Sequence, residues 1–107
     1  MVENTSDKIF KAIADPKRRE ILKMLVSEQE ELNINFISDK FTESRQAITK
    51  HLKILEWASL IKIEKKGRGT FCSANPEGLV LVDQWLDEYR KYWMSIPGAI
   101  DDYLSEL

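Results

Sequence analysis

The amino-acid sequence predicts a mainly α-helical fold with a small β-hairpin, arranged as a winged helix-turn-helix with a long C-terminal helix. Three segments carry this prediction. Residues 34–57 hold two amphipathic stretches joined by a tight connection, residues 61–73 alternate apolar and charged side chains around a glycine-rich turn, and residues 76–107 open with a long heptad-like stretch. Periodicities of this kind are the primary sequence signal for helices and hairpins.

Length and composition are those of one globular domain. The 107 residues are 43% hydrophobic and 32% charged, which suits a single modest core. The longest apolar run, Leu79 to Val82, is far too short to span a bilayer. The single cysteine, Cys72, excludes an intramolecular disulfide and suits a reducing compartment. We therefore expect a cytoplasmic protein without membrane attachment, residues 1–107 forming one domain.

The charge is distributed unevenly, although its net value is only −2. Residues 44–73 carry seven Lys or Arg side chains against two acidic ones, whereas residues 74–107 carry two against seven. A basic middle segment between acidic flanks is the electrostatic pattern of a small module that binds nucleic acid.

Two helices precede the basic segment, and an Asp-Pro dipeptide separates them. The first, within residues 1–14, begins near Thr5 or Ser6 and ends before Asp15, because the residue before a proline disfavours helical geometry. Asp15 then caps the second helix, with Pro16 at its first position. The apolar stripe of the first helix consists of Ile9, Phe10 and Ile13.

Three cations, Lys17, Arg18 and Arg19, occupy the first turn of the second helix. Cations there are unfavourable in isolation, because the helix dipole is positive at that end. A nearby polyanion would relieve the conflict, and a solvated cluster is the alternative. The polar stretch from Ser27 to Glu31 is expected to form the loop that follows.

Residues 34–57 predict the helix-turn-helix. Asn33 can cap a short helix that directs Ile34, Ile37 and Phe41 inward. Thr42-Glu43 then connects it to a second helix. In this motif the first helix supports the second, and the second presents its outer face to DNA.

The second helix separates apolar from basic side chains. At about 100° per residue, Ile48, Leu52 and Leu55 stack on one face, and the opposite face carries no carboxylate. Lys and Arg contact phosphates and guanine, Gln contacts adenine and Thr contacts either, so this face suits the major groove. An ordinary amphipathic helix with a solvated basic face is the alternative. The DNA-contacting residues predicted here are Ser44, Arg45, Gln46, Thr49, Lys50 and Lys53.

Residues 61–73 predict the wing. The segment from Ile61 to Lys65 alternates with period two, Gly67 to Gly69 is a turn, and Thr70 to Ser73 returns as the partner strand. Basic side chains cluster at the tip, although a plain surface hairpin with a solvated tip is the alternative. We expect the tip to reach flanking phosphates or the minor groove through Lys66 and Arg68.

Asn75-Pro76 begins the long C-terminal helix. Its apolar residues follow at spacings of three and four, which is the pattern of a packing seam. This surface is too large for the rest of a small domain to cover, so residues 1–14 and 76–107 are expected to pack across a twofold axis in a homodimer. The four aromatic residues between 85 and 93 could instead line a small-molecule pocket. The predicted dimer interface is Ile9, Phe10, Ile13, Trp85, Tyr89, Tyr92, Trp93, Ile96 and Ile100.

Two motifs resemble the ArsR-type winged-helix repressors. Ile9 to Leu22 looks like the opening of these proteins, and Ser44 to Leu55 is similar to their recognition helix. Trp57 to Ile61 and the turn at residues 67–69 fit as well, so the resemblance covers nearly the whole chain. It implies a homodimeric regulator of transcription that binds double-stranded DNA, usually a repressor acting on a palindromic operator.

The chain departs from the metal-sensing members of that family. Those members carry a cysteine pair in the helix before the recognition helix, where this chain has Phe36 to Phe41, or histidines on the last helix, and residues 76–96 contain none. One Cys and one His cannot supply a soft-metal site of three or four ligands. We expect no metal and no cofactor, and the small-molecule effector stays unknown.

His51 and Cys72 are the remaining reactive side chains. His51 lies at the edge of the apolar arc, which favours a structural or phosphate-contacting role, and Cys72 has no second cysteine to resolve an oxidised form. One histidine supplies no confident catalytic set, so an enzyme is not expected. A protein-interaction module without DNA binding and a small-molecule- or redox-responsive regulator are the alternatives.

Overall fold

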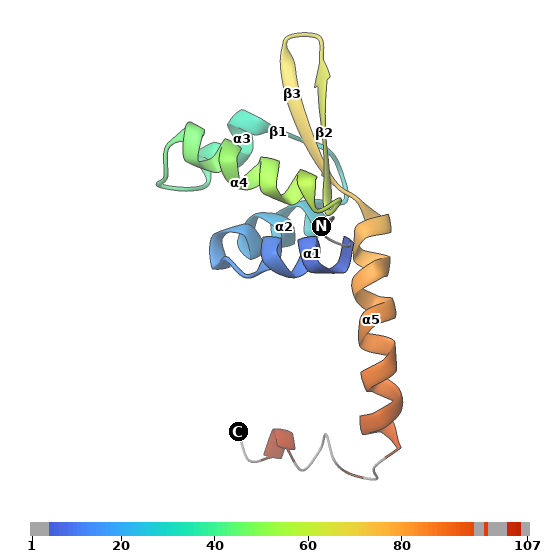
Figure 1. The fold of residues 1–107 in the computed structure, drawn as a ribbon. Coiled ribbons are helices and arrows are strands. Elements are labelled where there is room, and N and C mark those ends of the chain that lie inside the picture. The colour runs from blue at the N-terminus through green and yellow to red at the C-terminus, as the bar shows by residue number, and fades with distance from the viewer. Residues whose placement is uncertain (1–4, 96–97, 99–102, 106–107) are drawn as a thin grey trace.

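The computed structural model describes residues 5–95, 98 and 103–105. The helical class with a hairpin is confirmed, and Figure 1 shows the β2–β3 hairpin and α5 extending in different directions from a helical body. The elements are α1 (Thr5–Ile13), α2 (Pro16–Glu28), β1 (Leu32–Asn33), α3 (Ile34–Asp39), α4 (Arg45–Trp57), β2 (Ile61–Lys66), β3 (Gly69–Ala74) and α5 (Pro76–Met94).

Four helices begin at side chains that the sequence identifies as caps. Asp15, Asn33, Ser44 and Asn75 each accept a hydrogen bond from a backbone amide in the first turn that follows, over 2.8 to 3.3 Å. Such a bond satisfies an amide that has no partner within the helix. The starts of α2, α3, α4 and α5 are therefore set locally.

The sheet contains a third strand that the sequence analysis missed. β1 pairs antiparallel with β3, with Leu32 opposite Cys72, and β3 lies between β1 and β2. β1 has two residues, too few to show an alternating pattern. The predicted loop is also too long, because Ser27 and Glu28 belong to α2, which ends at Gln29 in a left-handed conformation (φ 56°).

The apolar face of α4 is enclosed by the rest of the chain. Ile48, Leu52 and Leu55 have an exposed fraction of 0%, as do Ile21 and Leu25 of α2. Burying an aliphatic side chain of this size contributes about 1.5–3 kcal/mol relative to leaving it exposed. The core therefore fixes which face of α4 is directed outward.

Helix α1 also contributes to this core, which corrects one prediction. Ile9 is only 1% exposed, and Ala12 is fully buried. The interpretation of Ile9 as a dimer contact is wrong, because its own chain already encloses the side chain. Ile13 packs against the core as a partly buried residue, and Phe10 lies at the outer side of α1 against Trp85 of α5.

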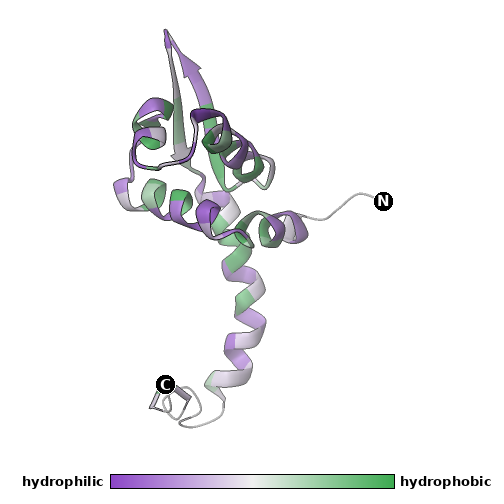
Figure 2. Ribbon diagram, turned by 90° about the vertical axis from the view of Figure 1, so that its left-hand side faces the viewer, coloured by the Kyte–Doolittle hydropathy of each residue, from purple (hydrophilic) through white to green (hydrophobic). Residues whose placement is uncertain are grey.

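Helix α5 is anchored to the body at its start. A Cβ atom on Gly78 would lie 2.1 Å from the carbonyl oxygen of Ser59, so only glycine allows this close approach. The Asn75 side-chain amide donates to the same oxygen over 2.9 Å. Farther along, α5 leaves the body (Figures 1 and 2), and the radius of gyration is 16.7 Å, above the roughly 13 Å of a compact 100-residue domain.

Candidate nucleic-acid interface

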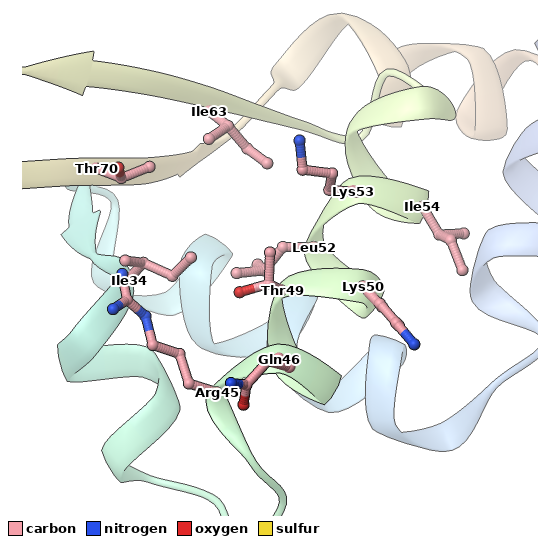
Figure 3. Close-up of a pocket in the computed structure, with 10 residues that line it drawn as sticks. All are labelled: Ile34, Arg45, Gln46, Thr49, Lys50, Leu52, Lys53, Ile54, Ile63 and Thr70. Carbon is pink, nitrogen blue, oxygen red and sulfur yellow. The ribbon is translucent and has the colours of Figure 1, made fainter.

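A groove of about 870 Å³ separates the outer face of α4 from the hairpin. Figure 3 shows the side chains of α4 on one side and the strand residues Ile63 and Thr70 on the other. Five of the residues predicted to contact DNA line this groove, namely Arg45, Gln46, Thr49, Lys50 and Lys53. Ser44 does not line it, because its hydroxyl caps α4 by accepting from the Ala47 amide over 3.1 Å.

The groove cations have no carboxylate partner within the described part of the chain. Arg45, Lys50 and Lys53 are exposed, and none of them lies within 4.0 Å of a described carboxylate oxygen. In Figure 3, Arg45, Thr49 and Lys53 lie on the side of α4 toward the hairpin, and Lys50 lines the far edge of the groove, on the other side of α4. Three unpaired positive charges beside an amide and a hydroxyl form a surface suited to an anionic ligand with hydrogen-bonding groups.

Of the two hairpin cations predicted to contact DNA, Lys66 is paired and Arg68 is unpaired among the described residues. Lys66 Nζ lies 2.8 Å from Glu31 Oε2 and 3.7 Å from Glu64 Oε2. The hydrogen bond to Glu31 is the main reason that the pKa of Lys66 is raised. Arg68 is exposed at the tip and has no ion-pair partner among the described residues. The tip is hydrophilic in Figure 2.

The first-turn cations of α2 find partners inside the chain. Lys17 Nζ lies 3.1 Å from Glu43 Oε2, and this contact raises the pKa of Lys17 and lowers that of Glu43. Arg18 and Arg19 donate to backbone carbonyls of α1, with Arg19 Nη1 at 2.8 Å from the oxygen of Ile13. Neither a polyanion nor a solvated cluster is needed to relieve the predicted conflict, because the carbonyl end of α1 lies against this turn.

The two reactive side chains, His51 and Cys72, are both at least partly buried. His51 is half-buried, and its Nδ1 atom lies 3.4 Å from Nη1 of Arg18. Cys72 is fully buried, and burial raises the pKa of its thiol to about 11, with Glu56 as the lesser cause. Because the thiolate is the reactive form, an enclosed thiol that stays protonated is a poor nucleophile.

Ligands for a metal ion do not gather in the part of the chain that the structure describes. No group of three or more His, Cys, Asp or Glu side chains is placed there to hold one. Within the same residues, none of the helices combines the length and the apolar character needed to cross a membrane.

An exposed aromatic face extends from α1 along α5. Phe10 and Trp85 meet edge to face with ring centroids 4.7 Å apart, and Trp85 lies 4.6 Å from Tyr89. Trp85, Tyr89 and Tyr92 follow at spacings of four and three and are 41%, 46% and 69% exposed. Trp93 is half-buried, whereas Ile96 and Ile100 lie outside the described residues. A contiguous apolar surface on a small protein marks an interaction site, and we refer to Phe10, Trp85, Tyr89 and Tyr92 as the aromatic face.

Known proteins share this sequence and fold. A family model described as an HTH domain matches residues 17–70. The transcriptional repressor SdpR of Bacillus subtilis (strain 168) is 35% identical over 78 residues, which cover 73% of this chain and 84% of the relative. The crystal structure of the ArsR family transcriptional regulator RHA00566 aligns with a TM-score of 0.75 at 28% identity, covering 90% of this chain and 99% of that one. The homodimeric winged helix-turn-helix domain Mb0332 of Mycobacterium bovis shares the fold, with a TM-score of 0.65 at 16% identity over 85% and 91% of the two chains.

Proposed function

Because this chain belongs to the ArsR-type winged helix-turn-helix transcriptional regulators, we propose that it represses transcription by binding a palindromic operator in double-stranded DNA as a homodimer. The family is a non-enzymatic class of DNA-binding regulators. The observation that carries the proposal is the groove beside α4, where three unpaired cations flank Gln46 and Thr49.

The groove residues divide into those that contact bases and those that contact the phosphate backbone of DNA. The Gln46 amide can pair with adenine through two hydrogen bonds, and Arg45 can pair with guanine or a phosphate. Lys50 and Lys53 supply charge for phosphates on either side. Arg68 is available to flanking DNA as it stands, whereas Lys66 would exchange Glu31 for a phosphate.

The aromatic face supports the homodimer. Its side chains are large and aromatic, and those on α5 are exposed, so a second copy of the same face would remove them from water. A twofold dimer would set two recognition helices about 34 Å apart, one turn of DNA. The second half-site matters because a single small module buries too little surface to compete with non-specific DNA. Mb0332, which has this fold, is itself homodimeric.

Repression is supported by the relative SdpR, which is named a transcriptional repressor. A repressor of this kind would occupy its operator without catalysing any step. Selecting DNA that this protein retains from a random duplex pool tests the whole proposal. The selected DNA is expected to be an inverted repeat with half-sites one helical turn apart. When this sequence is placed over a promoter, the protein should lower transcription in vitro.

Salt dependence gives the second part of the test. Affinity for the selected duplex should fall with a log–log slope of about −0.9 for each phosphate neutralised. A slope near zero would contradict DNA binding as the function, and selected sequences without twofold symmetry would contradict the dimeric mode.

A further inference from the structure

We propose that Arg18 and His51 form a bridge that positions the recognition helix α4 against α1, so that both residues set operator affinity without touching DNA. The inference rests on the proposed DNA binding and adds to it two positioning residues that lie outside the groove. The bridge joins three helices, because Arg18 belongs to α2, its carbonyl partners belong to α1 and His51 belongs to α4.

The Arg18 side chain is fixed at the carboxyl end of α1. Its Nε donates to the carbonyl oxygen of Ala12 over 2.6 Å, and its Nη2 donates to that of Lys11 over 3.3 Å. Nη1 lies 3.9 Å from Oδ2 of Asp15. The last carbonyls of a helix have no partner within it, and the dipole is negative there, so a planar cation is held firmly at this place.

The same Nη1 nitrogen of the guanidinium also connects to the recognition helix. Nη1 of Arg18 lies 3.4 Å from Nδ1 of His51, 33 positions away in sequence. A guanidinium has donors only, so Nδ1 must accept and the proton of a neutral His51 must lie on Nε2. The contact therefore selects one tautomer of one side chain on α4.

The core alone does not supply this directional constraint. Leu52, beside His51, is fully buried, but apolar contacts are non-directional and tolerate small rotations of a helix. A hydrogen bond from a fixed donor restrains both the rotation and the sliding of α4. Base reading requires donor–acceptor distances of about 2.7–3.2 Å, so a small rotation would weaken the contacts of Gln46 and Arg45. Because α1 also carries Phe10 of the aromatic face, the bridge links the proposed dimer contact to the recognition helix.

Arg19 supplies a matched control on the same turn. Its Nη1 donates to the carbonyl oxygen of Ile13 over 2.8 Å, so it also caps α1 with a guanidinium. No hydrogen bond or ion pair joins Arg19 to α4 within the described residues. Replacing Arg19 removes the same charge and a similar cap while leaving the bridge intact.

Affinities for the selected operator and for an unrelated duplex are measured for the full chain and its variants. Arg18→Ala and His51→Ala should each weaken operator binding about tenfold, and the double variant should be no weaker than Arg18→Ala alone. Arg19→Ala should stay within about twofold of the parent. His51→Asn, whose Oδ1 can accept in place of Nδ1, should recover most of the affinity. The unrelated duplex should bind all variants equally, with an unchanged salt slope.

Two outcomes overturn the proposal. If Arg18→Ala weakens both duplexes alike and flattens the log–log salt slope by about one, Arg18 is a phosphate contact and not a positioning residue. If the two single losses add in the double variant, the residues act independently.

A measurement without DNA keeps this inference separate from the proposed function. Nitrogen chemical shifts of the His51 ring should show the Nε2–H tautomer in the parent and in Arg19→Ala, and a mixture of tautomers in Arg18→Ala. Circular dichroism confirms that each variant is folded. A tautomer that does not respond to Arg18→Ala overturns the bridge even if the operator is bound, whereas a responding tautomer in a protein that binds no DNA supports the bridge and contradicts only the proposed function.

Discussion

Helices α4 and α5 are both amphipathic, but the chain covers them in opposite ways. The apolar face of α4 is 0% exposed at Ile48, Leu52 and Leu55, so that its polar face remains at the surface together with Trp57 at its last position. On α5, Gly78 is the buried residue, whereas the helix exposes Trp85, Tyr89 and Tyr92. What a helix leaves uncovered indicates the chemistry of the partner it lacks: a polar anion for α4 and a second apolar surface for α5.

The cations of the two helices also differ in whether they have ion-pair partners. On α5, Arg90 pairs with Asp83 and Lys91 lies 3.7 Å from Asp87, so its cations are already neutralised. Lys50 and Lys53 of α4 have no such partner among the described residues. Exposed ion pairs contribute little to stability, but they do remove a cation from competition for phosphate. The basic face of α4 is therefore the one suited to DNA.

Tyr92→Asp should give the largest effect, because it places a charge on the aromatic face. Transferring an unpaired carboxylate into an apolar interface is strongly unfavourable, so the variant should be a folded monomer. Losing the second half-site should weaken operator binding by about a thousandfold, toward the non-specific level. Sedimentation and operator titration measure the two effects.

Met94→Asp is the matched control for that substitution. Met94 has the same exposed fraction as Tyr92, 69%, and lies two residues later, on the other side of α5. The Met94→Asp substitution introduces the same charge and should leave the dimer and the operator affinity intact. A monomeric Tyr92→Asp protein that binds the operator as tightly as the parent would contradict the dimeric mechanism.

Gln46→Ala should give the next largest effect, on specificity. The variant should lose about 1–3 kcal/mol of discrimination at one base pair in each half-site. Sequences selected from a random pool should then be degenerate at that pair and unchanged elsewhere. Lys23→Ala, at an exposed position on α2, is the control and should leave the selected sequence unaltered. Unchanged selectivity in Gln46→Ala would remove this residue from the base contacts.

The features that sequence reasoning identified are local ones. A cap such as Ser44 acts within three residues of itself, and the side chains that α4 contributes to the groove follow from the helical repeat of α4 alone. The helix starts and the clustering of Arg45, Gln46 and Lys53 could therefore be predicted without tertiary information. The contact of these residues with DNA stays a prediction.

The features that sequence reasoning missed depend on distant segments. β1 is extended because it pairs with β3, since two residues carry no strand pattern of their own. Ile9 looked available to a partner because a helical repeat does not show which neighbour covers a stripe. The position of the cations in the first turn of α2 looked unfavourable because only the dipole of α2 itself could be considered. In the structure, the carbonyl end of α1 lies against Arg18 and Arg19.

Lys66→Ala should give a smaller effect that does not depend on sequence. Losing one phosphate contact should weaken all duplexes alike and flatten the salt slope by about one. Because Glu31 holds Lys66 at 2.8 Å in the free protein, Glu31→Gln should act in the opposite direction and strengthen binding to every duplex. If both variants bind like the parent over a salt series, the hairpin tip does not contact DNA.

Cys72 should have the smallest effect on DNA binding, and it tests the redox-responsive alternative. Its side chain is fully buried on β3 opposite Ile63 and Leu32. A native thiol with a pKa of about 11 remains protonated at neutral pH, so an alkylating reagent at pH 7.5 should label the folded protein only as fast as it unfolds. Peroxide treatment at that pH should leave operator affinity unchanged. Rapid labelling of the native protein, together with release of DNA by peroxide, would contradict a structural role.

The same thiol makes stability depend on alkaline pH. The folded state holds this proton more tightly than an unfolded chain, whose thiol has the ordinary pKa of 9.0, while the folded value is about 11. Between these two values the unfolded state loses the proton first, so the free energy of unfolding falls as pH rises through that window. The loss attributable to Cys72 should be on the order of 3 kcal/mol and should be absent below about pH 8. Urea unfolding of the parent and of Cys72→Ala across this range isolates the effect, since every other titrating group is common to both. Parallel stability curves for the two proteins would mean that the thiol ionises in the folded state as readily as in water, and the buried position of Cys72 would then be wrong.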